Sequence, residues 1–302
     1  MSAPAIYITG ATASGKSALA LHLAKRLGGE IISVDSMQVY HGLDIGTAKP
    51  SAAEQAKVPH HLIDVAELDE PFDAAKFVRL VKQAEAAIRS RDARPIFCGG
   101  TGLYFRALFD GLGESPPGDE PLRNELEAMP LDRLLTELAT KDPATFESID
   151  RQNQRRVVRA VEVIRLTGKP YSSQRSSWDE LSQAPGNFFC ITREGDHLTA
   201  RIHERVDAMF AQGLVAETQG LARRGLRENR TASQAIGYRQ VLEHLDGGPG
   251  RTETVELVKA RTRQFAKRQR TWFRNQMQCR PVEWAAGEPA DTCGERLTGL
   301  FG

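Results

Sequence analysis

The amino-acid sequence predicts an α/β fold, in which a parallel β-sheet is flanked by helices and carries an all-helical insertion domain. Two observations support this prediction. Short apolar runs typical of strands buried on both faces alternate with helical patterns, and the middle of the chain has helical patterns without strands. The 302 residues, 40% hydrophobic and 26% charged, fit one large or two ordinary domains and exclude disordered, collagen-like and coiled-coil proteins.

Four apolar runs are predicted to form strands, at residues 5–9, 30–36, 94–100 and 188–192. A helical pattern at 16–27 follows the first run, and another at 73–89 lies between the second and the third. Because a helix that joins two strands of one sheet forms a right-handed crossover, we expect the strands to be parallel and both faces of the sheet to be covered by helices.

Residues 113–187 are predicted to form the helical insertion domain, and residues 1–112 together with 188–302 the α/β core. The turn-rich sequence GLGESPPGDEP opens the insertion, and QAPGN precedes the return to a strand. After the last strand the chain is helical again. Three glycines are predicted to end these helices as left-handed C-caps, namely Gly213, Gly225 and Gly247.

A phosphate-binding motif lies between the first strand and the first helix. The sequence GATASGKS, at 10–17, matches G-x-x-x-x-G-K-[ST] in the strand–loop–helix context that this motif requires. Backbone N–H groups of such a loop bind an anion, while Lys16 reaches the terminal phosphates and the Ser17 hydroxyl is expected to bind Mg²⁺. The motif predicts a P-loop NTPase-like fold and a bound diphosphate or triphosphate, as in ATP-binding proteins, without naming the rest of the ligand.

Two polar side chains follow predicted strands, at the edge where open parallel sheets bind ligands. Asp35 follows the second strand and is interpreted as a metal ligand, a general base or a cap of the next turn. Thr101, in GGTGLY, follows the third strand and is interpreted as a ligand contact or the N-cap of the next helix. Arg201 and Arg205 share one helix face, and either would bind a diphosphate if it points into the crevice rather than into solvent.

Positive charge is concentrated in two segments, although 40 Lys and Arg residues against 39 Asp and Glu give a net charge of only +1. Residues 259–274 carry seven Lys and Arg residues and no acid, in a long helix predicted at about 252–277. Residues 151–165 are also rich in arginine. Unmixed positive charge indicates contact with a nucleic acid. The long helix is predicted to bury a stripe formed by Val258, Phe265 and Trp272.

Several classes of protein are excluded by the sequence. The start has no signal-peptide pattern and no stretch is apolar enough to span a membrane, so we expect a cytoplasmic protein. His60 and His61 have no further ligand at metal spacing. The four cysteines are widely separated and are expected to be reduced thiols, mostly in the core: Cys98, Cys190, Cys279 and Cys293.

The chain resembles the tRNA dimethylallyltransferase (isopentenyltransferase) family in the motifs GATASGKS, SVDSMQVYHGLDIGTAKP, PHHLID, FCGGTGLYFRALFDGL, RRVVRAVEV, RIHERVDAM, AIGYRQ and FAKRQRTWFR. The resemblance runs from residue 4 to about 284, and the DSxxxY, DIGTAKP and GGTGLY blocks are not generic to phosphate-binding loops. It implies a bacterial-type enzyme that transfers a dimethylallyl group from dimethylallyl diphosphate to N6 of the adenosine 3′-adjacent to the anticodon, releasing diphosphate. Mg²⁺ is the implied cofactor and the anticodon stem-loop of tRNA the implied partner.

The resemblance also implies roles for individual residues. Asp35 matches the general base, Thr101 a residue that positions the reacting atoms, and Ser17 a ligand of Mg²⁺. The implied diphosphate-binding residues are Gly10, Ala11, Thr12, Ala13, Ser14, Gly15, Lys16, Ser17 and Arg205, of which Lys16 and Arg205 also count as catalytic. The implied tRNA-binding residues are Asp35, Ser36, Met37, Gln38, Thr101, Arg123, Arg159, Ala160, Val161, Glu162, Val163, Val241, Leu242, Glu243, His244, Leu245, Asp246, Arg274, Asn275, Gln276, Met277, Gln278, Cys279, Arg280 and Pro281.

Two other functions are compatible with the bare phosphate loop. The first is a P-loop kinase of a nucleoside or small metabolite, with Asp35 as the base for an acceptor hydroxyl. The second is a non-catalytic RNA-binding protein with a vestigial nucleotide site, against which the intact Lys16, Ser17 and Asp35 argue. We expect a monomer with no membrane contact.

Overall fold

A computed structural model describes residues 3–174, 178, 181–182 and 184–301. The chain divides into two compact units, a core unit of Met1–Phe109 with Leu181–Gly302 and a helical unit of Asp110–Glu180. The insertion predicted from the sequence has the bounds 113–187, which overlap this unit. In the part of the chain that is described, no helix has the length and apolar character needed to cross a membrane.

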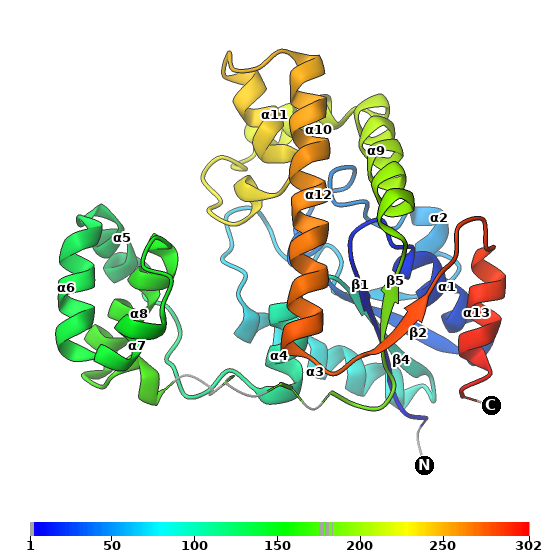
Figure 1. Ribbon diagram of the computed structural model, residues 1–302, viewed down its shortest axis with the longest axis horizontal. Helices are drawn as coiled ribbons and strands as arrows, with labels where there is room; N and C mark the ends of the chain where they lie inside the picture. The colour runs from blue at the N-terminus through cyan, green and yellow to red at the C-terminus, as the bar shows by residue number, and fades with distance from the viewer. Residues whose placement is uncertain (1–2, 175–177, 179–180, 183, 302) are drawn as a thin grey trace. The chain divides into compact units, whose positions relative to one another are not determined.

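The core unit is built on six parallel strands in the spatial order β3-β2-β4-β1-β5-β6 (Figure 1). The strands are β1 (Ile6–Gly10), β2 (Gly29–Val34), β3 (His60–His61), β4 (Arg94–Gly99), β5 (Phe188–Thr192) and β6 (Arg280–Glu283). The four predicted strands are present, and the α/β fold is confirmed. The edge strands β3 and β6 were not predicted because β3 has only two residues and the side chains of β6 are mostly exposed, so neither has an apolar pattern.

Helices cover both faces of this sheet. The helices that begin in the core unit are α1 (Lys16–Leu27), α2 (Ala52–Gln55), α3 (Ala74–Ser90), α4 (Gly102–Asp110), α9 (Gly195–Gln212), α10 (Leu214–Ala222), α11 (Tyr238–Leu245), α12 (Arg251–Gln276) and α13 (Ala290–Thr298), with a 3₁₀ helix at Ala232–Gln234. The three predicted C-cap glycines all have positive φ, +104° at Gly213, +96° at Gly225 and +84° at Gly247, as left-handed helix ends require.

Alternate side chains of the strands enter two apolar layers. On one face, Ile6 and Ile8 of β1 pack with Leu19 of α1, and the C-terminal helix α13 packs on the same side. On the other face, Tyr7 stacks on Phe97 of β4 with ring centroids 4.6 Å apart. This second layer extends to α3, α4 and α12. Burial on both faces explains why the central strands have continuous apolar sequences.

Helix α12, the long orange helix of Figure 1, buries a stripe that agrees only in part with the predicted one. Val258 is buried and Trp272 is half-buried against the core, but Phe265 is 36% exposed, so the prediction is wrong at Phe265. The buried residues of the helix are Thr254, Val258, Thr262, Ala266, Gln269 and Phe273. Small and polar side chains lie on part of this face because the backbone of two loops approaches it there, and a search for apolar periodicity therefore does not find them.

The helical unit contains α5 (Glu120–Ala128), α6 (Leu131–Lys141), α7 (Pro143–Ser148) and α8 (Gln154–Thr167), with a 3₁₀ helix at Tyr171–Ser173. Its core is made by apolar residues of α5, α6 and α8, including Leu126, Leu134 and Val161. Among its described residues no strand occurs, as the sequence predicted.

Candidate active site at the carboxyl edge of the sheet

The sheet topology brings the predicted site residues to one edge. Along the order β2, β4, β1 and β5, the chain leaves the strands at Asp35, at Gly100, at the phosphate loop and at Arg193. The chain passes from β1 to the β4 side of the sheet and later to the β5 side, so β1 lies at the topological switch point. Open α/β sheets bind ligands at the carboxyl ends of strands beside this point.

The phosphate loop between β1 and α1 offers unpaired hydrogen-bond donors. Among the residues described, nothing accepts from the backbone N–H groups of Ala13, Gly15, Lys16 and Ser17. The hydroxyl of Ser14, a residue only 1% exposed, is likewise without a partner there. These N–H groups lie at the start of α1, where the helix adds partial positive charge. Such a cluster of donors is an anion-binding site.

The carbonyl groups of the same loop are held by cationic side chains. Arg201 Nε donates to the Ala13 carbonyl at 2.9 Å, and Arg193 Nε donates to the Ser14 carbonyl at 2.6 Å. Carbonyls bound in this way are directed to the arginines and away from a bound anion. From its position in the sequence, Arg201 was one of two candidate diphosphate ligands, whereas its Nε binds the loop backbone.

Arg193 is itself fixed by Trp284, to which sequence analysis assigned no role. Its guanidinium carbon lies 4.1 Å from the centroid of the Trp284 ring, in a cation–π contact. A Cβ atom at Gly15 would lie 2.6 Å from this ring, and Gly15 has φ of +100°, so both the close approach and the backbone conformation require glycine here. The segment after β6 therefore supports the phosphate loop from behind.

Lys16 and Arg205 bring two positive charges to the loop. Lys16 Nζ donates to the Ala11 carbonyl at 3.3 Å, and Arg205 Nη1 donates to Thr12 Oγ1 at 3.4 Å. Burial lowers the pKa of Lys16, and the charge of Arg205 lowers it further. Burial, with the charge of Arg201, also lowers the pKa of Arg205. A bound anion would compensate these crowded charges.

The lowered pKa of Lys16 predicts a pH dependence of anion binding. The protonated amine of Lys16 binds the anion, so affinity for inorganic diphosphate falls as this amine loses its proton. Because the pKa of Lys16 is lowered, this happens at a pH below 10.5, the ordinary pKa of lysine. Lys16→Arg, which stays charged over this range, is the reference. Ionisation of diphosphate affects both proteins equally, so it drops out of the ratio of their affinities. Calorimetric titration between about pH 7 and pH 10 should show the affinity of the wild-type protein falling relative to Lys16→Arg as pH rises. A constant ratio would contradict the prediction.

Asp35 and Thr101 lie on adjacent loops that are hydrogen-bonded to each other. Asp35 Oδ1 accepts from the backbone N–H groups of Met37, at 2.8 Å, and Gln38, at 3.3 Å, so it does cap the next turn. Among the described groups, none donates to Oδ2, which is left for a proton or a ligand. Thr101 Oγ1 accepts from the Ser36 N–H at 3.1 Å and thus joins the two loops.

Gln269 of α12 is a site residue that sequence analysis missed. Its Oε1 accepts from the Thr12 N–H at 2.8 Å, and its Nε2 donates to the Gly100 carbonyl at 2.9 Å. The Thr12 N–H, which belongs to the predicted diphosphate-binding set, is therefore already paired. Gln269 lies four positions from Phe265 and three from Trp272 of the predicted stripe, but no apolar pattern marks a polar residue there.

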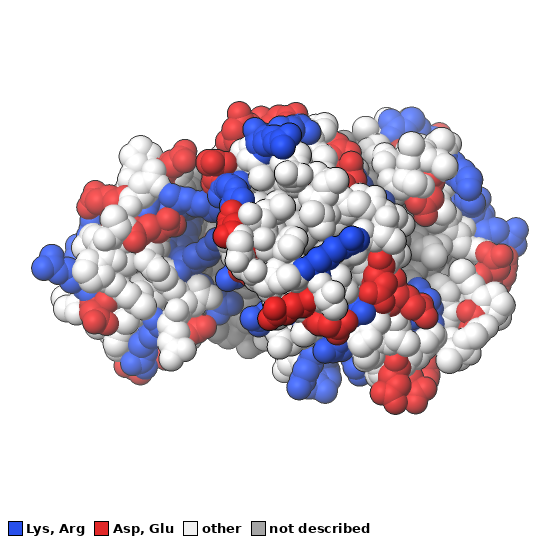
Figure 2. Space-filling model, turned by 90° about the horizontal axis from the view of Figure 1, so that it is seen from above, with Lys and Arg blue, Asp and Glu red and all other residues white. Residues whose placement is uncertain are grey.

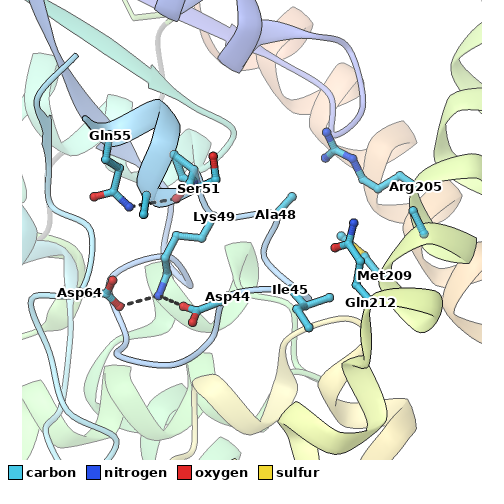
Figure 3. A pocket seen from close by; sticks show the side chains of 13 residues that line it. Asp44, Ile45, Ala48, Lys49, Ser51, Gln55, Asp64, Arg205, Met209 and Gln212 are labelled. Atoms are coloured by element: carbon cyan, nitrogen blue, oxygen red, sulfur yellow. Dashed lines mark hydrogen bonds and ion pairs between the residues drawn. The ribbon is translucent and has the colours of Figure 1, made fainter. Parts of the chain in front are cut away.

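A pocket of about 610 Å³ shares Arg205 with the phosphate-loop site, although no residue of the loop itself lines it (Figure 3). Arg205 lines it together with Met209 and Gln212 of α9, and the opposite wall is formed by residues 44–55. In that wall Lys49 is bonded to Asp44 at 2.6 Å and to Asp64 at 2.5 Å. The DIGTAKP segment, noted in the sequence only as a family block, thus faces Arg205 across this pocket.

The predicted tRNA-binding residues of the core unit differ in accessibility. Gln38 is occupied within the protein, since it accepts from Ser33 Oγ and donates to the Thr47 carbonyl. Val241 and Leu242 of α11 and Met277 are buried. The exposed members are Glu243, Asp246, Arg274, Asn275, Gln278, Arg280 and Pro281, and the half-buried ones are Asp35, Ser36, Met37, Gln38, Thr101, His244, Leu245, Gln276 and Cys279.

The charged residues among the predicted tRNA-binding residues of the helical unit form one ionic cluster. Glu162 is fully buried and binds Arg123 at 2.9 Å and Arg159 at 2.6 Å. Burial tends to raise the pKa of Glu162, but the hydrogen bonds from the two arginines outweigh it, and the pKa lies below its usual range. The side chains of the neighbouring Ala160, Val161 and Val163 are buried, so this run supports the two arginines from within.

The positive charge of α12 is only partly available to a ligand. Lys259 is paired with Asp207 and Glu256, whereas Lys267, Arg268 and Arg270 are exposed and make no ion pair with any residue described. Arg268 lies over the ring of Phe265. Figure 2 shows acidic and basic side chains intermixed on the face seen from above, so no continuous basic surface covers that face.

The fold and the loop define a P-loop-type α/β protein with an anion site at the carboxyl edge of its sheet. Residues 38–276, well over half of the chain, match the IPP transferase family, and the chain belongs to this family. The resemblance seen in the sequence motifs is confirmed.

Individual relatives agree with this assignment. The chain is 48% identical over 292 residues to tRNA dimethylallyltransferase 1 of Trichlorobacter lovleyi, a match that covers 93% of each chain. It is 47% identical over 283 residues to the tRNA dimethylallyltransferase of Halorhodospira halophila, covering 91% of each. Among solved structures it resembles the tRNA isopentenylpyrophosphate transferase of Bacillus halodurans, with 38% identity, a TM-score of 0.71 and coverage of 98% of this chain and 95% of that one. A eukaryotic dimethylallyltransferase acting on tRNA gives a TM-score of 0.80 at 27% identity, covering 98% of this chain and 78% of that one.

Proposed function

We propose that this protein is a tRNA dimethylallyltransferase, a prenyltransferase that moves a dimethylallyl group from dimethylallyl diphosphate to N6 of the adenosine 3′-adjacent to the anticodon and releases diphosphate. Membership of the IPP transferase family supports the proposal, as do the names of relatives that match almost the whole chain. The single structural observation that carries it is the placement of an anion site at the end of β1 and of the Asp35 carboxylate at the end of β2, at the same edge of the sheet and with β4 between them. Such a transfer needs both a site that holds the diphosphate and a base that takes the proton from the adenine amine.

On the acceptor side, Asp35 serves as the general base. The exocyclic amine of adenine is a poor nucleophile because its lone pair is delocalised into the ring. A carboxylate that takes the proton as the C–N bond forms accelerates the reaction by ~10²- to 10⁴-fold. Asp35 Oδ1 is committed to the Met37 and Gln38 N–H groups, which leaves Oδ2 as the proton acceptor. Thr101, bonded to Ser36, holds this loop in place.

On the donor side, the C1–O bond breaks and negative charge develops on the diphosphate. The unpaired N–H groups of Ala13, Gly15, Lys16 and Ser17 and the charges of Lys16 and Arg205 stabilise that charge. No phosphate is transferred. The loop therefore holds a leaving group, although its architecture is that of nucleotide-binding proteins.

The residues present fit a Mg²⁺ ion that is held mainly by the substrate. Ser17 is exposed at the start of α1, and no group of three or more His, Cys, Asp or Glu residues in the described part of the chain forms a metal cage. Mg²⁺ commonly takes one or two protein ligands and completes its shell with phosphate oxygens and water. Ser17 would supply the protein ligand, and the ion would neutralise charge on the departing diphosphate.

The acceptor base must leave the stack of the anticodon loop to reach Asp35. Extrusion of a base costs a few kcal/mol, which contacts to the RNA backbone offset. The exposed Lys267, Arg268 and Arg270 of α12 and the Arg123 and Arg159 cluster of the helical unit are the proposed phosphate contacts.

The test is transfer of label from dimethylallyl diphosphate to tRNA by the purified protein, with mass analysis of the digested RNA. We expect the label on a single adenosine beside the anticodon, dependent on added Mg²⁺. ATP and a nucleoside acceptor form the control reaction. Transfer of a γ-phosphate with no prenylated RNA would instead assign the protein to the P-loop kinases, and RNA binding without either reaction would assign a vestigial site.

Binding to tRNA is predicted to depend on the basic residues of α12. Lys267→Ala with Arg268→Ala removes two charges, so the slope of log K against log salt should become shallower by up to about 1.4, at about 0.7 per phosphate contact. Binding of inorganic diphosphate should be unchanged. The measurement is a salt titration of tRNA affinity by filter binding or fluorescence anisotropy.

The matched control is Arg79→Ala with Lys82→Ala, which removes two exposed charges from α3. This variant should keep the wild-type slope. If Lys267 and Arg268 instead cover the surface with their aliphatic stems, the first variant will lose thermal stability and keep its slope, which would remove the pair from the RNA interface.

A further inference from the structure

Gln269 joins two loops that come from different strands. Its side chain is 7% exposed, on the buried face of α12, between the phosphate loop after β1 and the Gly100 loop after β4. The Thr12 N–H only donates and the Gly100 carbonyl only accepts, so the linking side chain needs an acceptor and a donor at its tip. Glutamine has both; glutamate lacks the donor, and lysine and arginine lack the acceptor.

Position 100 is a glycine, which leaves space for the side chain of Gln269. A Cβ atom at position 100 would lie 2.3 Å from Gln269 Nε2, so any residue other than glycine there displaces the amide. The next nearest atom to that Cβ position, apart from the carboxamide of Gln269, is the Gly10 carbonyl oxygen at 3.6 Å, an ordinary contact distance. The glycine at 100 therefore accommodates Gln269 and nothing else nearby.

Further hydrogen bonds link the two loops held by Gln269 to the residues proposed to act on the donor and on the acceptor. On the donor side, Thr12 Oγ1 accepts from Arg205. On the acceptor side, Gly100 is followed by Thr101, whose Oγ1 accepts from the Ser36 N–H beside Asp35. One side chain thus connects the loop that would hold the diphosphate with the loop that orients the general base.

From this geometry we propose that Gln269 is a positioning residue, which fixes the spacing between the donor loop and the acceptor loop. The inference rests on the proposed transferase function. Within the described chain, the side-chain hydrogen bonds of Gln269 go to backbone groups of the protein, so it need not strengthen the binding of either substrate. Because a misplacement of about 1 Å between reacting groups costs up to about 10²-fold in rate, its effect should appear in turnover.

The first test is Gln269→Met, which keeps the length and approximate volume of the side chain and removes both hydrogen bonds. We expect kcat for tRNA prenylation to fall at least about tenfold, while KM for dimethylallyl diphosphate and KM for tRNA stay within about threefold. The matched control is Gln264→Met, the same change at an exposed position of the same helix, which should leave kcat unchanged.

The second test is Gly100→Ala, which displaces the amide of Gln269 from the other side. It should lower kcat with the same unchanged KM values. The double variant Gly100→Ala with Gln269→Met should be no slower than the slower single variant. Both changes disrupt the same link between the two loops, so the second change has nothing further to remove. If Gln269→Met fails to fold, as judged by thermal melting, Gly100→Ala decides the question by itself.

Unchanged kcat in both single variants would overturn the inference. A rise of tenfold or more in either KM, with kcat unchanged, would also overturn it, because Gln269 would then be a binding residue. Fully multiplicative effects in the double variant would also overturn it. Absence of prenylation by the wild-type protein would be a different result, because it would refute the proposed function before any variant is compared.

Discussion

Asp35→Asn should reduce single-turnover prenylation by at least about a hundredfold and leave tRNA affinity within a few-fold of wild type. The substitution removes the proton acceptor and almost no volume. An asparagine oxygen can still accept from the Met37 and Gln38 N–H groups, so the turn after β2 is preserved. Chemistry and binding should therefore separate in this variant. The measurement is the rate of transfer from bound dimethylallyl diphosphate with tRNA saturating.

The control for this experiment is Asp69→Asn, the same change at an exposed position away from the strand ends. It should behave as wild type in both rate and affinity. A rate for Asp35→Asn within tenfold of wild type would refute the general-base role. Asp35 would then retain only the turn-capping role that its Oδ1 contacts already show.

Lys16→Ala and Arg205→Ala should each lower kcat/KM for dimethylallyl diphosphate by roughly 2 to 4 kcal/mol, or about 30- to 1,000-fold, without a matching change in tRNA affinity. Each removes a charge from a half-buried position beside the phosphate loop, where burial and a neighbouring arginine lower the pKa of both groups and a bound anion would compensate their charge. Steady-state kinetics with varied donor, together with the tRNA dissociation constant, measure the two effects separately.

Lys25→Ala, at an exposed position of the same helix α1, is the control for Lys16, and Arg79→Ala on α3 serves for Arg205. Neither should change donor kinetics. If Arg205→Ala abolished tRNA binding and spared the donor, Arg205 would belong to the RNA surface. Its contact with Thr12 Oγ1 would then be structural.

The main architecture of the site was predictable because its signals are local in the sequence. The loop at 10–17 has a fixed spacing of glycine, lysine and serine, and Asp35 and Thr101 are the polar residues that follow apolar strands. Carboxyl ends of parallel strands lie at one edge of the sheet, so an α/β fold was expected to bring these residues to the same edge. The residue roles taken from the family resemblance remain predictions, which the substitutions above test.

What the sequence did not reveal are the side chains that reach the site from far along the chain. Gln269 binds a residue 257 positions away, and Arg193 one 179 positions away. Nothing in the local pattern around either residue marks such a partner. The stripe predicted for α12 was incomplete for a related reason, since part of the buried face meets loop backbone and carries Thr262, Ala266 and Gln269 where apolar residues were sought.

The sequence by itself determined the α/β class, the four main strands and the phosphate loop, because periodicity and loop spacing are properties of short segments. The tertiary structure alone decided which polar groups of that loop are free. The Thr12 N–H is taken by Gln269 and the Ser14 carbonyl by Arg193, while the N–H groups of Gly15, Lys16 and Ser17 have no acceptor among the residues described. Hydrogen bonds depend on distance and direction in space, which the order of residues along a chain does not specify until the sheet has brought its strand ends together.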